Sequence, residues 1–246
     1  MIARRFPVTA FGFPMGGEEK PSMETWRRHL QVWWDALVHP QTAGRLVLRD
    51  DADAAFERFL CLAIALLYAF YGASMGLFRG RLPAAGSAAK LPFLFLLTLL
   101  VCFPALYAAN CHLGPRLRVR HCLRLLLLAT SANAVALASY APIGFFFTLT
   151  TSRAGYTFLV LMHVFVFAAS GLVSLLVLAV VFQSTAREAG RRLRPLFLVA
   201  WGALYGFTGM EMAWALRPWI GSFTVPYTLF REREGSFFES VWALLF

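Results

Sequence analysis

Three polar side chains, Tyr140, His163 and Glu211, lie inside apolar stretches at a similar distance from their ends. His163 follows Tyr156 by seven residues and Glu211 precedes Arg217 by six. At about 1.5 Å per helical residue, both lie roughly 9–11 Å from a helix end. A charged side chain inside a membrane costs about 2.5–3.5 kcal/mol on insertion scales. Together these residues form a candidate intramembrane cluster that could carry a proton or bind a cation.

A structural interpretation of the same residues stays open. Glu211 could reach interfacial water or Arg153, and His163 could hydrogen-bond a neighbouring carbonyl group. A second polar group nearer the other end of its stretch, Thr130, Ser131 and Asn133, predicts hydrogen bonds between helices.

The segment between the second and third apolar stretches carries residue types that bind zinc, Cys111, His112, His121 and Cys122. Adjacent ligands are geometrically awkward, three arginines lie between the two pairs, and the spacing matches no familiar zinc finger. This is a weak metal candidate, and we expect neither a metal, a cofactor nor a disulfide.

Motifs of common enzymes are missing from the sequence. It contains no GxSxG elbow, no phosphate loop and no HExxH helix. The formal net charge of +10 comes mostly from short arginine-rich segments, which favours contact with anionic lipid over nucleic acid. We therefore expect a protein that is not an enzyme and does not bind nucleic acid.

The composition indicates that transmembrane helices position the candidate polar residues. Of 246 residues, 59% are hydrophobic and 15% charged, and the mean hydropathy is +0.62, whereas soluble domains carry about 25% charged residues. Five stretches have the roughly 20 apolar residues that a membrane crossing requires. They predict an all-α, polytopic helical bundle of about five spans, within 59–216, at residues 59–78, 91–109, 125–147, 156–182 and 196–216.

Prolines mark several expected helix positions. Pro92 follows Leu91 and predicts the first turn of the second span, whereas Pro104 predicts a kink within it. The third span is expected to end around Pro142.

Basic residues predict the orientation, because loops rich in lysine and arginine stay in the cytoplasm. They are more frequent in 1–58, 110–124 and 183–195 than in the alternate segments. The pattern predicts a cytoplasmic N-terminus and an outside C-terminus. The strong excess of arginine over lysine indicates a GC-rich bacterial genome, and hence the inner (cytoplasmic) membrane of a bacterium.

The N-terminal segment, 1–58, contains apolar residues at helical spacing: Met23, Trp26, Leu30, Trp33, Trp34 and Leu37. This pattern predicts an amphipathic helix in the cytoplasmic interface, where Trp26, Trp33 and Trp34 would lie among headgroups. The alternative is a helix packed on the cytoplasmic side of the protein itself. We expect Asp50, Asp51 and Asp53 to lie at the start of the first spanning helix.

The C-terminal segment, 217–246, is too polar for a span and too aromatic for a disordered tail. Arg217 and Trp219 suit the outer interface, and Pro218 should end the fifth helix. We expect an ordered cap outside the membrane.

Small residues recur in two spans as GxxxG patterns, which allow helices to approach closely. The glycines and the alanine that continue the second pattern are Gly72, Gly76, Gly202, Gly206, Gly209 and Ala213. They predict close packing within one subunit or between subunits.

Several segments resemble an uncharacterised family of bacterial multi-span inner-membrane proteins whose members are often labelled as containing an actin-binding Wiskott homology domain. The resemblance covers 59–241 and rests on YGASMGLF, KLPFLFLLTLLVCFPALY, APIGFFFTLTTS, MAWALRPWIGS and FREREGSFFESV. The label implies an LKKT-like actin-binding stretch, which this chain lacks outside its spans. The architecture is also distantly similar to the Yip family, and neither family supplies catalytic residues.

Two functions follow as hypotheses. The first is a non-enzymatic membrane subunit that self-associates or anchors a partner. The second is an oligomeric ion channel or an ion-coupled transporter that uses His163 and Glu211. A membrane-embedded enzyme has the least support.

Overall fold

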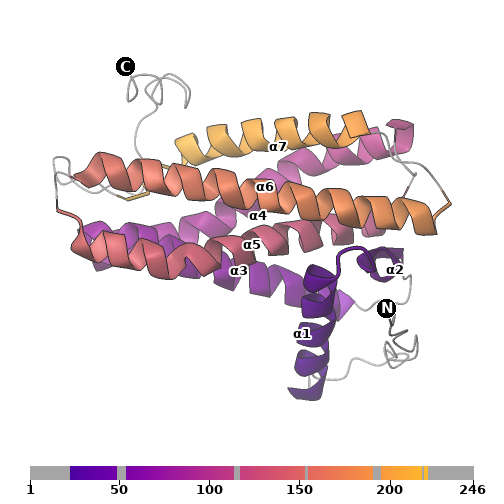
Figure 1. Cartoon of the computed structure of the whole chain (residues 1–246), viewed down its shortest axis with the longest axis horizontal. Helices are drawn as coiled ribbons and strands as arrows, with labels where there is room; N and C mark the ends of the chain where they lie inside the picture. Colours follow the sequence, from indigo (N-terminus) through magenta and orange to yellow (C-terminus); the bar gives the residue numbers. More distant parts are fainter. Residues whose placement is uncertain are drawn as a thin grey trace, which may run out of the picture.

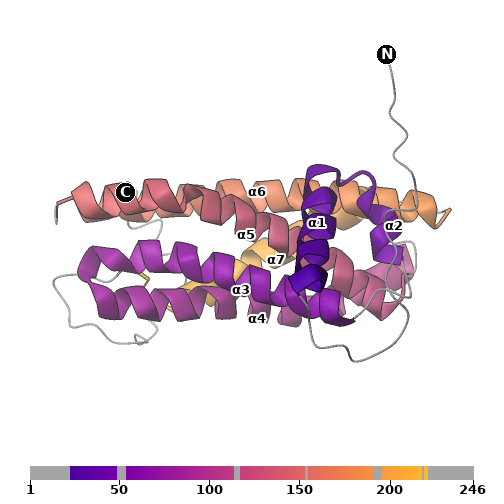
Figure 2. The same ribbon diagram turned by 90° about the horizontal axis from the view of Figure 1, so that it is seen from below.

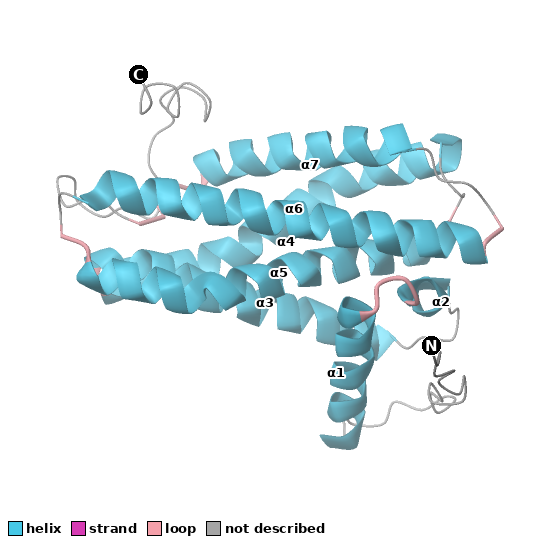
Figure 3. Ribbon diagram, viewed as in Figure 1, coloured by secondary structure: helices cyan, strands magenta, loops and turns pink. Residues whose placement is uncertain are grey.

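The computed structural model describes residues 23–48, 54–113, 117–152, 155–190, 195–217 and 219–220, and every secondary-structure element in these ranges is helical (Figure 3). The side chains of Leu113, Pro195 and Phe197 are not described. The elements in chain order are α1 (Met23–Val38), α2 (Ala43–Leu48), α3 (Ala54–Gly76), the 3-10 turn η2 (Leu77–Arg79), α4 (Arg81–Leu113), α5 (Val119–Thr150), α6 (Tyr156–Glu188) and α7 (Pro195–Ala215).

Four segments are long and apolar enough to cross a membrane: Ala54–Arg79, Arg81–His112, Val119–Thr150 and Tyr156–Glu188. The expected all-α architecture is confirmed for the described residues, with four helices that could cross a membrane by length and composition. The predicted fifth span falls on α7, a helix of 21 residues.

The long helices α3 to α7 run up and down one bundle, each antiparallel to the one before it (Figure 1). α3 packs along both α4 and α5, α5 packs along α6, and α7 lies mainly against α4. Figure 2 shows α3 and α4 side by side on one side of the bundle and α6 on the other. The core is therefore centred on α3, whose Phe56, Leu60, Ile64, Tyr68 and Tyr71 are fully buried.

Glycine sets the close approach of α3 to α4. A Cβ atom at Gly72 would meet the Ser87 carbonyl and lie 3.0 Å from the Ala88 Cα, and one at Gly76 would lie 2.6 Å from the Ala84 Cα. The connection between these helices turns at Gly80, whose φ of 125° is open to glycine.

The second span begins earlier than predicted. Residues 81–90 were expected to form a loop and Pro92 the first turn, but α4 starts at Arg81, so Pro92 lies inside the helix and Pro83 lies in its first turn. The polar residues of 81–90 look like a loop, yet the segment is rich in alanine, the best helix former. Packing against Gly72 and Gly76 then stabilises this first part of the helix.

The third span also extends beyond its expected end. α5 continues to Thr150 with Pro142 in its interior. The basic segments 110–124 and 183–195, expected as loops, are helical over much of their described length, because α4 ends at Leu113, α5 begins at Val119 and α6 ends at Glu188.

The two N-terminal helices lie toward one end of the bundle, α1 some way short of that end and α2 nearer to it (Figure 1). α1, where the amphipathic helix was expected, runs across the bundle rather than along it (Figure 1). α2 packs on α6, where a Cβ atom at Gly44 would lie 2.6 Å from the Ser184 Oγ.

Some expectations fall on other parts of the chain. Asp50, Asp51, Asp53 and Pro218 lie outside the described residues. Of the expected C-terminal cap, the structure describes Arg217 and 219–220.

Candidate functional site: buried polar groups of the bundle

His163 lies inside the bundle with 2% of its surface exposed. Its Nδ1 and the Oη of Tyr71, on α3, share a hydrogen bond of 2.8 Å. The Tyr71 ring also packs edge-on against Phe167, at a centroid distance of 5.7 Å. Tyr71 is the partner that the sequence did not indicate, since nothing in an apolar run shows which helices become neighbours.

Small and hydroxyl side chains surround this pair. The Ser74 Oγ donates to the Tyr71 carbonyl oxygen (2.7 Å), and the Thr148 Oγ1 donates to the Ser74 carbonyl oxygen (3.3 Å). A Cβ atom on Gly144 would lie 3.6 Å from the His163 Cε1 and 3.2 Å from the Ser74 Oγ. The second ring nitrogen of His163, Nε2, is buried and has no hydrogen-bond partner among the described residues.

The other two members of the candidate cluster occupy different surroundings. Tyr140, on α5, is partly buried and packs against the apolar core. Glu211, on α7, is also partly buried, and its helix packs mainly on α4. The hydrogen bond of His163 goes to Tyr71 and to neither of these residues.

A second polar level lies closer to α1. The Tyr68 Oη donates to the Asn133 Oδ1 (2.9 Å) and to the Thr130 carbonyl oxygen (3.3 Å). The Trp33 Nε1 of α1 donates to the Ser131 Oγ (2.9 Å). The predicted hydrogen bonds between helices at this level are thus confirmed for Ser131 and Asn133.

A buried arginine was missed by the sequence reasoning. Arg124 of α5 has 0% exposure, and its Nη1 donates to the carbonyl oxygens of Leu46 (3.2 Å) and Val47 (3.1 Å) at the end of α2. Its Nη2 lies 3.0 Å from the Glu57 Oε1 of α3. Arg124 looks like the last charge of a basic loop, but the four leucines that follow it could have indicated a buried helical position.

The Cys and His residues of the weak metal candidate do not form a group of three or more. Cys122 is fully buried with its Sγ 4.0 Å from the Leu117 carbonyl oxygen, whereas His112 is exposed. Within the described ranges, no three Cys, His, Asp or Glu residues come together as metal ligands would.

The second GxxxG pattern faces two different surroundings. At Gly202 a Cβ atom would lie 2.9 Å from the Leu175 side chain of α6, and at Gly209 it would lie 3.8 Å from the Thr98 Cγ2 of α4. At Gly206 the same atom would meet no described atom within 4 Å. The Ala213 carbonyl oxygen accepts a bond from the Trp219 Nε1.

The expected interfacial residues differ in exposure. Trp33 is buried, whereas Trp26 and Trp34 are 37% and 56% exposed. At the other end of the bundle, the Arg217 guanidinium lies 3.7 Å from the centre of the Trp214 ring, and the Trp219 carbonyl oxygen accepts a bond from Ser87.

Comparison with known proteins identifies no relative: no protein-family model, no curated protein and no solved structure matches this chain.

Proposed function

We propose that this chain is a non-enzymatic integral membrane subunit with five spans, α7 being the fifth, that self-associates or anchors a partner in the membrane. The proposal is carried by the observation that buried polar side chains form hydrogen bonds between helices. Tyr68, Trp33 and Arg124 direct their hydrogen bonds at neighbouring helices, where they hold the bundle together. Such bonds between helices are typical of a scaffold in lipid.

The surface of α7 offers a place for self-association. Gly206 and Ala203 are exposed next to Val199 and Phe207, which are 65% and 53% exposed. Gly206 is the half of the GxxxG pattern that no helix of the same chain covers within the described residues. A second copy could pack closely there.

The mass of the detergent-solubilised particle tests this proposal. Native mass spectrometry should find an oligomer or a defined complex, and Gly206→Leu should reduce the mass to that of one chain. Gly171→Leu is the matched control, because Gly171 on α6 also has no neighbour within 4 Å of a Cβ atom. A monomer for the unmodified chain, with no bound partner, would contradict the proposal.

The location we propose is the inner membrane of a bacterium, with the N-terminus in the cytoplasm and the C-terminus outside. In support, α1 and α2 lie toward one end of the bundle and α7 ends toward the other (Figure 1). Anionic lipid would lie at the end that carries Arg45, Arg120 and Arg187, which are exposed.

A second candidate function is an ion channel or an ion-coupled transporter. The Nε2 of His163 favours this candidate, because it is buried and has no hydrogen-bond partner among the described residues. Such a polar atom inside a membrane could bind an ion or exchange a proton. Purified protein in vesicles should then conduct ions or protons, and His163→Gln and Glu211→Gln should each reduce the flux. Vesicles whose flux equals that of protein-free vesicles would rule this candidate out.

A further inference from the structure

Successive residues of a helix are about 100° apart around its axis, and on this basis the residues of α1 fall into three faces. One face packs on the bundle through the buried residues His29, Val32, Trp33 and Ala36. A second face is polar and exposed at Glu24, Gln31 and Asp35, and the exposed Arg27 lies at its border with the third face. The third is apolar and exposed, and we call it the apolar stripe: Met23 (77% exposed), Trp26, Leu30 (51%), Trp34 (56%) and Val38 (50%).

Helices α4, α5 and α6 are longer than a membrane is thick. α5 and α6 contain 32 and 33 residues, or about 48–50 Å, whereas the hydrocarbon core is about 30 Å and needs roughly 20 residues. Counting about 20 residues from Thr150, at the outer end of α5, and from Arg79, at the end of the turn η2 that follows α3, reaches Ser131 and Leu60. The rest of α5 then lies on the inner side of the membrane.

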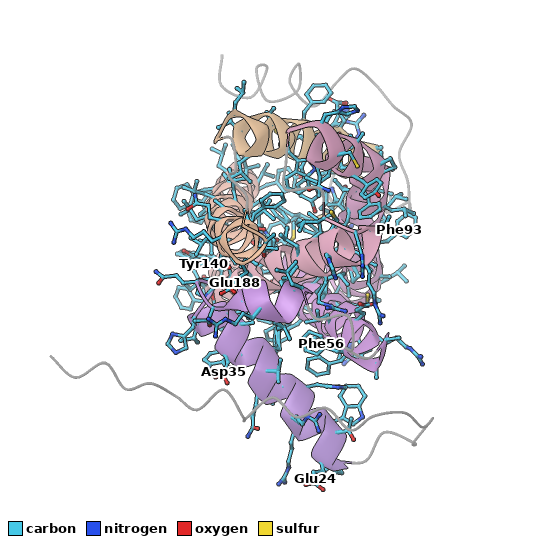
Figure 4. The ribbon with its side chains drawn as sticks, turned by 90° about the vertical axis from the view of Figure 1, so that its right-hand side faces the viewer. Glu24, Asp35, Phe56, Phe93, Tyr140 and Glu188 are labelled. Carbon is cyan, nitrogen blue, oxygen red and sulfur yellow. The ribbon has the colours of Figure 1, made fainter. Side chains whose placement is uncertain are left out.

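The contacts of α1 fall at this inner boundary. The Trp33 Nε1 bonds the Ser131 Oγ at 2.9 Å, and the Trp26 ring lies 5.5 Å from the ring of Phe59, next to Leu60. α1 also runs across the helix axes, which places it parallel to the plane of the membrane (Figure 1). In the end view of Figure 4, it extends away from the bundle, with Glu24 at its far end.

Charged groups gather on the inner side of this level. Glu57 pairs with Arg124 and Arg120 there, and Arg45 of α2 pairs with Glu188 at the end of α6 (3.0 Å). Ion pairs of this kind suit headgroups and water, and not hydrocarbon. Glu57 lies in the chain between Phe56 and Phe59, whose rings pack against His29 and Trp26, so α1 lies directly beside the charged end of the bundle.

We propose that α1 docks in the cytoplasmic interface of the phospholipid bilayer, with the apolar stripe among the acyl chains and the polar face toward water. This inference rests on the proposed function, since it requires a bundle that spans the membrane. The polar face carries Glu24 and Asp35, with Arg27 at its border, so apolar burial drives docking and anionic headgroups add little. The inner ends of α5 and α6, with α2, then form a cytoplasmic head.

Site-directed spin labelling of the full chain in phosphatidylcholine vesicles tests this docking. Leu30→Cys and Gln31→Cys place labels on adjacent residues of different faces, in a chain whose partly exposed cysteines, Cys61 and Cys111, are replaced by alanine. The label at Leu30 should be accessible to lipid-soluble oxygen and that at Gln31 to a water-soluble nickel complex. Adding phosphatidylglycerol should leave both accessibilities unchanged.

Other occupants of the stripe give different results. Equal nickel accessibility at both positions would show a helix in water, and an immobile label at Leu30 shielded from both reagents would show a protein partner or a second copy; either overturns the docking. A third label at Phe165→Cys, on a residue of α6 that is 71% exposed, reports on the bundle itself. If that label is accessible to water, the proposal that the bundle spans the membrane is contradicted, and with it the docking of α1.

Discussion

At the scale of the residue, two arginines of α5 share one carboxylate group but lie in different surroundings. Arg120 and Arg124 both contact the Glu57 Oε1, at 3.1 and 3.0 Å, and their side chains are 44% and 0% exposed. An exposed ion pair contributes about 0–1 kcal/mol to stability. Loss of Arg124 would leave Glu57 paired with Arg120, but the buried Leu46 and Val47 carbonyl oxygens would lose their donor, at about 1–3 kcal/mol for each unsatisfied group.

We therefore expect Arg124→Met to destabilise the bundle and to release α2, whose last carbonyl groups lose their donor. Arg120→Met, the matched control, should change the unfolding free energy by about 0–1 kcal/mol. Thermal unfolding in detergent measures both variants. Equal effects of the two substitutions would show that the burial of Arg124 contributes nothing.

The bond between Tyr68 and Asn133 gives a second prediction at this scale. Interhelical hydrogen bonds in membrane proteins contribute about 0.6 kcal/mol on average and up to about 1.7 kcal/mol. A double-mutant cycle of Tyr68→Phe and Asn133→Leu should show coupling in this range, since each change removes one end of the 2.9 Å bond. Tyr68→Phe combined with Ser139→Ala is the control: the Ser139 hydroxyl bonds its own helix at Ala136, so this cycle should show none.

At the scale of the element, apolar length predicts helices well and proline position predicts them poorly. The five apolar stretches all fall on α3 to α7. Pro92 and Pro142 nevertheless lie inside α4 and α5, because packing along the bundle continues a helix past a proline. An apolar sequence also does not indicate which helices pack against one another. For this reason the hydrogen bond between His163 and Tyr71 could not be predicted from the sequence.

The glycines of α3 and α7 should respond differently to the same substitution. Gly72→Ala places a methyl group against the Ser87 carbonyl, so α3 and α4 must separate and the unfolding temperature should fall. Gly206→Ala meets no described atom within 4 Å, so the fold of one chain should keep its stability. Circular dichroism of the two variants on heating compares them, and an unchanged Gly72→Ala protein would contradict the close contact.

At the scale of the whole molecule, both ends of the bundle carry basic residues, with Arg79 and Arg81 at the turn between α3 and α4, but among the described residues they are more frequent at the end with α1 and α2. Exposed arginines, Arg45, Arg120 and Arg187, gather at the end that carries α1 and α2. The opposite end includes the turn between α5 and α6, where Ser152 is exposed. Positively charged segments stay in the cytoplasm during insertion, so the first end should face inward.

This orientation predicts opposite labelling of two exposed residues, Ser152 and Gln183. In intact cells that express a chain with Cys61 and Cys111 replaced by alanine, a membrane-impermeant maleimide should modify Ser152→Cys and leave Gln183→Cys unmodified. Inside-out vesicles should reverse the result, because about 20 residues of α6 cross the hydrocarbon and Gln183 lies beyond them in the proposed cytoplasmic head. Labelling of Gln183→Cys in intact cells would show that the protein has the opposite orientation in the membrane. Protection of that residue in both preparations would instead place it in the hydrocarbon and contradict a head on the inner side of α1.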